Sequence, residues 1–187
     1  MGDLVIDFVN APRHPGDGAG IGRPEELAAW LTEAAPEVIP LLPTDTPGLR
    51  ALHTEAVALQ RAIRAIMREV TEGSPPDEAS QWVLDACLSE LGRSESLASN
   101  PDESQPFAVD VHLFARGPRA PLGVVAREAA QLLGSVAPQR LRQCAAEACE
   151  RWFVDLSKAG RRKWCSMATC GNRAKASRYR ERHSGTE

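Results

Sequence analysis

Four cysteines near the end of the sequence have the spacing of a metal site. They follow the pattern C-x4-C-x15-C-x4-C and are Cys144, Cys149, Cys165 and Cys170. Two close pairs separated by a loop can surround one ion with four thiolates, and zinc suits such a tetrahedral sulfur site best. The pattern therefore predicts one structural Zn2+. Iron in the same site, two disulfides, or four unrelated buried cysteines are the alternatives.

The same pattern argues against an enzyme. A zinc ion that is held by four thiolates has no open position at which to activate water. His53 and Glu55 match the first half of a zinc-deaminase signature, but its P-C-x-x-C half is absent, so His53 is expected on a helix surface. The glycine-rich residues 16–22 do not have the spacing of a phosphate-binding loop, and we expect a flexible loop there. The fifth cysteine, Cys87, lies in an apolar stretch and is expected in the core.

A small group of polar residues could form a ligand pocket if two expected strands are neighbours. Ordinary polar residues of strands and turns are the alternative. The group consists of Asp7, Asn10, Asp110 and His112.

Positive charge is concentrated in the same region as the four cysteines. Residues 139–183 have a net charge of +8, whereas the rest of the chain has a net charge of −11. Such an asymmetry indicates a polyanionic partner, and we expect double-stranded DNA, contacted mainly through its phosphates. A solvated face, or docking on the acidic part of the same chain, is the alternative. The expected contact residues are Arg161, Arg162, Lys163, Arg173, Lys175, Arg178, Arg180 and Arg182.

Two further functions fit the same charge distribution. The zinc module could be a protein-interaction adaptor that meets an acidic partner. It could also bind RNA, with Trp152, Trp164 or Tyr179 stacked on bases.

Residues 161–175, RRKWCSMATCGNRAK, closely resemble the C-terminal zinc finger of the CGNR family, which is named for the run at residues 170–173. Residues 149–157 are also similar to this family, and residues 4–10 are similar to the domain that usually precedes the finger. Members are described as stress-related bacterial transcription regulators. The resemblance implies the same role here, with the four cysteines as zinc ligands.

The N-terminal part has mainly helical patterns. Apolar residues recur every three or four positions from Leu49 to Val70, which predicts a long helix that Thr46 caps and Gly73 ends. This stripe is expected in the core of a bundle, and the seam of a homodimer is the alternative. Further helices are expected at 24–31, 121–136 and 173–182, with Asn172 as the cap of the last one and Gly171 in a tight turn. Another helix is expected to start from a capping box at residues 74–77, with Ser74 as its cap, and to run to about Leu91. Strands are expected at 4–9, 107–114 and 151–156, and connections at 94–106 and 138–143.

These patterns together predict a mostly α chain of the α+β type. Residues 1–137 are expected to form an acidic, mainly helical domain with a small antiparallel sheet, which senses a small-molecule ligand or mediates assembly. Residues 138–187 are expected to form the zinc module and its basic helix. No apolar run reaches the roughly 18 residues that cross a membrane, and no export signal is visible, so we expect a cytoplasmic protein without membrane contact.

Overall fold

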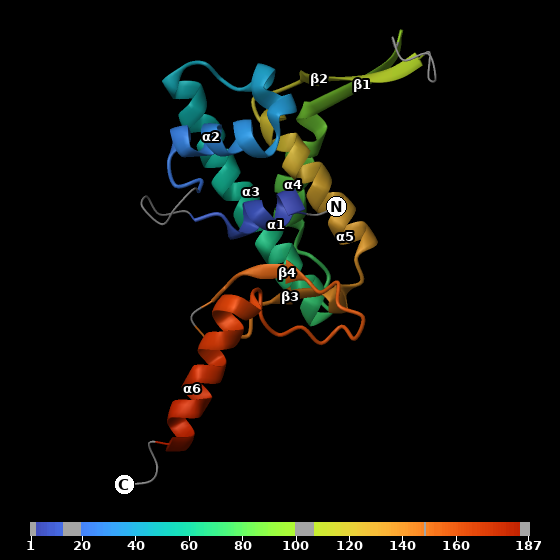
Figure 1. Ribbon diagram of the computed structural model, residues 1–187. Helices are drawn as coiled ribbons and strands as arrows, with labels where there is room; N and C mark the ends of the chain where they lie inside the picture. Colours follow the sequence, from blue (N-terminus) through green and yellow to red (C-terminus); the bar gives the residue numbers. More distant parts are fainter. Residues whose placement is uncertain (1–2, 13–19, 100–106, 148, 184–187) are drawn as a thin grey trace.

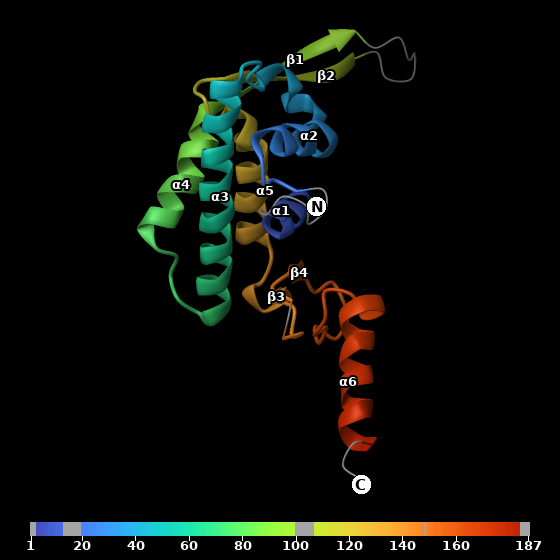
Figure 2. The same cartoon turned by 90° about the vertical axis from the view of Figure 1, so that its left-hand side faces the viewer.

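The longest helix, α3 (Thr46–Glu72), runs through a helical body, and the other helices of that body pack around it (Figures 1 and 2). The computed structural model describes residues 3–12, 20–99, 107–147 and 149–183. The apolar stripe of α3 is buried, as expected for a bundle core rather than for a dimer seam. Its buried members include Leu52, Ala56, Leu59, Ile63 and Ile66.

Local signals determine where the long helices begin and end. Asp45 caps α3 by accepting a hydrogen bond of 2.6 Å from the amide of Gly48, so the cap lies one residue before the predicted Thr46. Gly73 ends α3 in the left-handed conformation, with φ of 78°, which glycine adopts without steric cost. Asp77, rather than Ser74 of the expected capping box, caps α4 (Glu78–Glu90) through a 3.0 Å hydrogen bond from the amide of Ser80.

The other helices of the body are α1 (Asp3–Asn10), α2 (Pro24–Ala34) and α5 (Gly123–Ser135), with short turns η1 (Pro36–Leu41) and η2 (Ala120–Leu122). The prediction of a strand at residues 4–9 is wrong, because this segment is α1. Val5, Phe8 and Val9 are fully buried, and their spacing forms one face of a helix that packs against α3 and α5. A short apolar run of this kind does not distinguish a helix from a strand.

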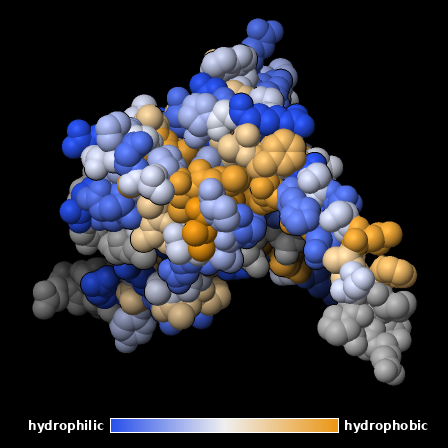
Figure 3. Space-filling view, turned by 90° about the horizontal axis from the view of Figure 1, so that it is seen from above, coloured by the Kyte–Doolittle hydropathy of each residue, from blue (hydrophilic) through white to orange (hydrophobic). Residues whose placement is uncertain are grey.

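A two-stranded antiparallel hairpin projects from the body. β1 (Leu91–Ser99) pairs with β2 (Phe107–Ala115), with Leu91 opposite Ala115 and Ser99 opposite Phe107. The strand at 107–114 was expected, but residues 94–99 were expected to be a connection. This part of β1 has few apolar residues and becomes a strand because β2 supplies its hydrogen bonds. Hydrophobic surface lies near the far end of the hairpin (Figure 3), where Leu97 and Val109 face each other and are 74% and 59% exposed.

A second, smaller sheet follows the helical body. It pairs β3 (Leu141–Gln143) with β4 (Trp152–Val154), and the turn η3 (Pro138–Arg140) precedes it, so residues 138–143 are more than a connection. Leu141 and Trp152 belong to the same hydrophobic core as the helices. The strand expected at 151–156 is shorter in the structure, because β4 ends at Val154 and Leu156 is 87% exposed.

The last helix, α6 (Asn172–His183), points away from the body (Figures 1 and 2). It is preceded by the π-helical turn η4 (Met167–Gly171), which Ser166 caps by accepting a hydrogen bond from the amide of Thr169. Asn172 is therefore not the cap; its side-chain amide donates to the carbonyl of Ala168. The overall architecture, mostly helical with two small antiparallel sheets, confirms the predicted fold class. In the part of the chain that is described, no helix is both long and apolar enough to span a membrane.

Candidate metal centre and basic module

The structure brings the four predicted metal ligands together. All four Sγ atoms lie within 4.8 Å of one another, and Sγ of Cys165 is 3.7 Å from those of Cys149 and Cys170. Sulfurs that surround one ion at about 2.3 Å occupy a tetrahedron with edges of about 3.8 Å. A disulfide has a sulfur separation of about 2.0 Å, and all four cysteines are free. The donor set and its spacing therefore fit one tetrahedral metal ion.

Backbone hydrogen bonds hold the two cysteine pairs in place. The amide of Cys144 donates to the carbonyl of Arg151 at 2.8 Å, which extends the pairing of β3 and β4 up to the first ligand. Between the two pairs, the amide of Ala145 donates to the carbonyl of Lys163 at 2.9 Å. Phe153 and Trp164 pack beside the cysteines in a small hydrophobic cluster. A short sheet and two aromatic side chains thus shape a site that is too small to form a core by itself.

The thiols of this site cannot all ionise without a cation. Burial opposes ionisation of Cys144, but hydrogen bonds from the amides of Cys165 and Ala146 lower the pKa of this thiol to about 7. Burial and the neighbouring sulfurs raise the pKa of Cys165 to about 12. Metal ligation needs deprotonated sulfur. A divalent ion at the centre supplies the positive charge that allows four adjacent thiolates.

A buried carboxylate organises the loop between β4 and the second cysteine pair. Asp155 is fully buried and accepts hydrogen bonds from the Ser157 hydroxyl at 2.6 Å and from the amides of Ser157 and Arg162 at 3.0 and 2.8 Å. The Ser157 hydroxyl, the two amides and the nearby Arg140 guanidinium hold the pKa of Asp155 below its usual range. Arg140 also donates to the carbonyls of Asp155 and Ser157. The loop is therefore fixed independently of the metal ligands.

Arg162, one of the expected DNA contacts, has internal partners. Its guanidinium lies 4.7 Å from the ring centre of Phe153 and donates to the carbonyls of Trp164, at 2.9 Å, and Cys165. Arg142 donates in turn to the Arg162 carbonyl at 3.0 Å. Arg162 therefore supports the metal loop, and its charge adds to the local potential.

The remaining expected contacts lie on two segments next to the metal centre. Arg161 and Lys163 are exposed on the loop before Cys165. Arg173, Lys175 and Arg180 are exposed on α6. Arg178 and Arg182 also belong to α6, but their side chains lie outside the described part of the structure. No acidic side chain forms an ion pair with the five exposed cations within the described residues.

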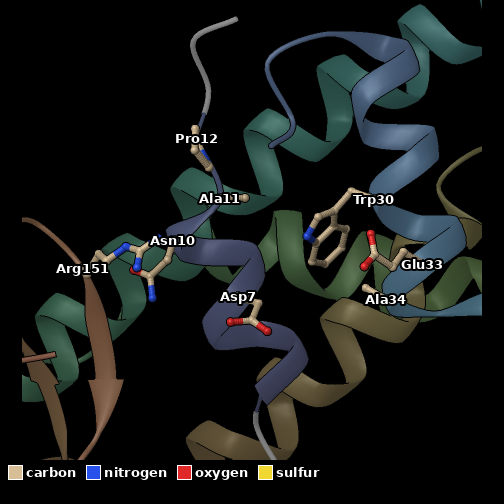
Figure 4. Close-up of a pocket in the computed structure, with 8 residues that line it drawn as sticks. All are labelled: Asp7, Asn10, Ala11, Pro12, Trp30, Glu33, Ala34 and Arg151. Atoms are coloured by element: carbon tan, nitrogen blue, oxygen red, sulfur yellow. The ribbon is translucent and has the colours of Figure 1, made fainter. Parts of the chain in front are cut away.

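The expected ligand pocket is only half assembled. Asp7 and Asn10 lie on α1 and line a pocket of about 460 Å³, together with Trp30 and Glu33 of α2 and Arg151 next to β4 (Figure 4). Asp110 and His112 do not join them, since they lie on β2 of the projecting hairpin. There the His112 ring is 3.2 Å from the hydroxyl of Ser96. The prediction assumed two neighbouring strands, whereas residues 4–9 form a helix.

Other predicted positions differ in part. His53 is half-buried rather than on the surface, and its Nε2 is 2.9 Å from the carbonyl of Ile21. Cys87 is fully buried as expected, and burial raises the pKa of its thiol to about 12. Of the glycine-rich run at 16–22, residues 16–19 lie outside the described residues.

Sequence reasoning did not find the residues that connect the helical body to the metal module. The Asn10 side chain donates to the Trp152 carbonyl and accepts from the Trp152 amide, both at 2.8 Å. Arg64 of α3 donates to the carbonyl of Val9 at 2.9 Å and forms a 3.2 Å ion pair with Glu150. In the sequence, Arg64 is a charged residue beside the apolar stripe of a helix. Such residues are common on solvated helices, so this position does not predict a contact with the metal module.

The fold and the site together define a class of protein: a helical body that carries a four-cysteine metal module and a basic terminal helix. Residues 140–183 match the family described as "CGNR zinc finger". Residues 2–136 match the family described as "Putative stress-induced transcription regulator", so the chain belongs to this regulator family. This confirms the resemblance that the sequence suggested. No curated protein matches the chain.

Proposed function

We propose that this protein is a transcription regulator that binds double-stranded DNA through its metal module. The observation that carries the proposal is α6, a cation-rich helix that projects from the closed sulfur site and whose described residues contribute nothing to the helical core. A helix of this width fits the major groove of B-form DNA. The family description supports a role in transcription.

The exposed cations suit phosphate contacts from two sides. Arg173 and Arg180 are seven residues apart on α6, which places them on one face of the helix two turns apart. Lys175 lies about 200° around the helix from Arg173, on the opposite face, and Arg161 and Lys163 add charge from the adjacent loop. Phosphate contacts fix the position of a helix on the duplex. An arginine that reaches into the major groove can recognise the edge of a guanine base.

The metal in this proposal is zinc, and its role is structural. Four sulfur donors favour zinc over the harder divalent ions, and the Sγ–Sγ distances of 3.7 Å are close to those of a ZnS4 tetrahedron. With four protein ligands, the ion has no position for water or substrate. We therefore propose a protein without catalytic activity, which acts in the cytoplasm on DNA.

The test is DNA binding by the full-length, zinc-loaded protein. Random duplexes are enriched by selection, and affinity is then measured by fluorescence anisotropy at several salt concentrations. We expect one enriched motif and a log–log salt slope of about −0.9 for each phosphate neutralised. Arg173→Ala and Arg180→Ala should each reduce the affinity, by about tenfold or more where the side chain reads a base.

The matched control is Arg61→Ala, an exposed arginine of α3 that lies outside the basic module. It should leave affinity and salt slope unchanged. Weak, sequence-blind binding that α6 substitutions do not alter would contradict the proposal and favour the adaptor. Tighter binding to single-stranded RNA than to duplex DNA would favour the RNA binder.

The proposal includes a ligand-sensing role for the pocket beside α1. Its lining combines the carboxylates of Asp7 and Glu33 with the ring of Trp30, a set that suits a small organic cation. Arg151 belongs to the metal module, so a ligand in this pocket would contact both parts of the chain. Thermal-shift screening of small amines should find a stabilising compound whose effect Asp7→Asn reduces; equal shifts in wild type and Asp7→Asn would contradict this role.

A further inference from the structure

A second pocket lies on another side of the junction between the helical body and the metal module. It has a volume of about 420 Å³ and lies between the last turns of α3 and the segment that holds β3 and the loop before Cys165. The lower end of α3 lies beside β3 (Figures 1 and 2). Its chemistry is determined by six of its lining residues, which are Arg68, Glu72, Arg142, Trp152, Arg162 and Lys163.

The charges around this pocket are strongly unbalanced. Four of its lining residues are cations, and Glu72 is the single acidic one among the described residues that line it. Within the described ranges, none of the four cations forms an ion pair. Arg142 and Arg162 donate to carbonyl groups, which leaves their full positive charges uncompensated. The pocket therefore has a positive potential that an anion would neutralise.

Two of the cations have side chains available for direct contact. Arg68 and Lys163 are exposed, and their side chains make no hydrogen bond within the part of the chain that is described. They come from opposite sides of the junction, since Arg68 belongs to α3 and Lys163 to the metal loop. An anion with several oxygen atoms could bind both.

A buried donor without a partner lies in the same lining. Trp152 is 3% exposed, and its indole Nε1 has no hydrogen-bond partner among the residues that the structure describes. An indole N–H can only donate, and a buried donor that lacks an acceptor destabilises the fold. An acceptor in the pocket would reach this atom only after the lining shifts, because the atom is shielded from solvent. The inference therefore rests on the four cations of the lining, and Trp152 adds one unpaired donor beside them.

We infer that this pocket binds a phosphate group that bridges α3 and the metal module. Phosphate has several strong acceptor oxygens and a charge that arginine and lysine recognise. The group can belong to a small phosphorylated effector or to the backbone of DNA, and only the second source rests on the proposed function. Bound phosphate would hold the metal module in one orientation on the helical body.

The first arm of the test uses pyrophosphate and the full-length, zinc-loaded protein without DNA, measured by calorimetry. Arg68→Ala and Lys163→Ala should each weaken binding about tenfold or more, whereas Glu72→Gln should strengthen it. Arg61→Ala, on the same helix but outside the pocket, should have no effect. Zinc content is measured before and after the titration, and it should stay constant, so that loss of the ion is not mistaken for binding.

The second arm measures DNA affinity of the same variants. If the phosphate comes from DNA, Arg68→Ala weakens DNA binding, reduces the salt slope by about 1, and pyrophosphate competes with DNA. If it comes from a small effector, Arg68→Ala leaves the affinity for DNA alone unchanged. The inference is overturned when neither pyrophosphate binding nor DNA affinity depends on Arg68, a cation of this pocket that is not among the expected DNA contacts. Pyrophosphate binding that depends on Arg68, in a protein that binds no DNA, would remove the proposed function and leave this inference intact.

Discussion

Asn10 and Trp152 are 142 residues apart in sequence, yet the side-chain amide of Asn10 forms two 2.8 Å hydrogen bonds with the backbone of Trp152. Asn10 ends α1 of the helical body, and Trp152 begins β4 of the metal module. The side-chain amide of Asn10 thus pairs with the backbone at the start of β4 in the way that a neighbouring strand would. Because Trp152 also packs in the helical core, the metal module is attached to the body by both polar and apolar contacts.

Asn10→Asp should weaken this attachment. The carboxylate can still accept from the Trp152 amide, but it cannot donate to the Trp152 carbonyl, which loses its partner. We expect the free energy of unfolding to fall by about 1–3 kcal/mol. The measurement is urea denaturation followed by tryptophan fluorescence. Asp7→Asn, one turn earlier on α1 and exposed, should change stability by less than about 0.5 kcal/mol. Equal losses in both variants would show that the Asn10 hydrogen bonds do not contribute.

Metal removal should separate the cysteines into two classes. In the loaded protein, we expect alkylating reagents to modify none of the five cysteines quickly, since the metal would shield the four predicted ligands and Cys87 is buried. A chelator should release one zinc ion and expose four reactive thiols, while most of the helical circular dichroism remains. Denaturant should then expose the fifth thiol.

Two cysteine variants distinguish the metal site from the core. Cys165→Ser should reduce bound zinc strongly, because one of the four ligands is lost. Cys87→Ala should keep the zinc and instead lower the stability of the helical body, because it leaves a small cavity. Full zinc content in Cys165→Ser, measured by elemental analysis, would exclude this residue as a ligand.

The cap of α4 should produce a measurable pH dependence. Hydrogen bonds from the Ser80 side chain and amide hold the pKa of Asp77 below its ordinary value of 3.8. The folded state therefore favours the ionised carboxylate, and its contribution is present above pH 3.8 and is lost as the pH falls through the lower, folded-state pKa. Asp77→Asn keeps a capping side chain but removes the titration. The stability difference between wild type and Asp77→Asn should thus shrink as the pH falls from about 6 to about 3; a constant difference would contradict the assignment.

Gly171→Ala should perturb the metal loop through close contacts. A Cβ atom at this position would lie 2.8 Å from Sδ of Met167 and 3.2 Å from Cδ1 of Trp164. We expect faster transfer of zinc to a chelator, because the Met167 and Trp164 side chains beside the cysteines must move. Gly134→Ala is the control: a methyl group at this position of α5 would meet no described atom within 4 Å, and alanine favours helices by up to about 1 kcal/mol. Faster zinc transfer in the control variant would show that the effect is not local to η4.

Much of the metal site could be predicted from sequence because its information is local. Four cysteines in two close pairs need only a turn at each pair and a returning loop, whatever the rest of the chain does. The repeat from Leu49 to Val70 likewise predicts α3, because apolar residues that recur every three or four positions form one continuous face only in an α-helix. The glycine at position 73 ends that helix by its own conformational freedom.

Other features were decided only by tertiary contacts. Residues 4–9 are apolar enough for a strand or a helix, and the space between α3 and α5 selects the helix α1. The second half of β1 has no strand pattern of its own and depends on β2. Because residues 4–9 form the helix α1 rather than a strand, Asp7 and Asn10 lie beside the metal module, whereas Asp110 and His112 lie on the hairpin.

The sequence by itself determined which residues can bind a metal, which helix carries the positive charge, and that the chain is mainly helical. Only the tertiary structure decided that Asn10 binds the backbone of Trp152, that Arg162 supports the metal loop, and that Arg68 and Lys163 line one pocket. The physical reason is the sequence separation over which each kind of interaction acts. Ligand spacing, helical periodicity and capping act over a few residues, whereas hydrogen bonds and charges between distant segments exist only after the core has brought those segments together.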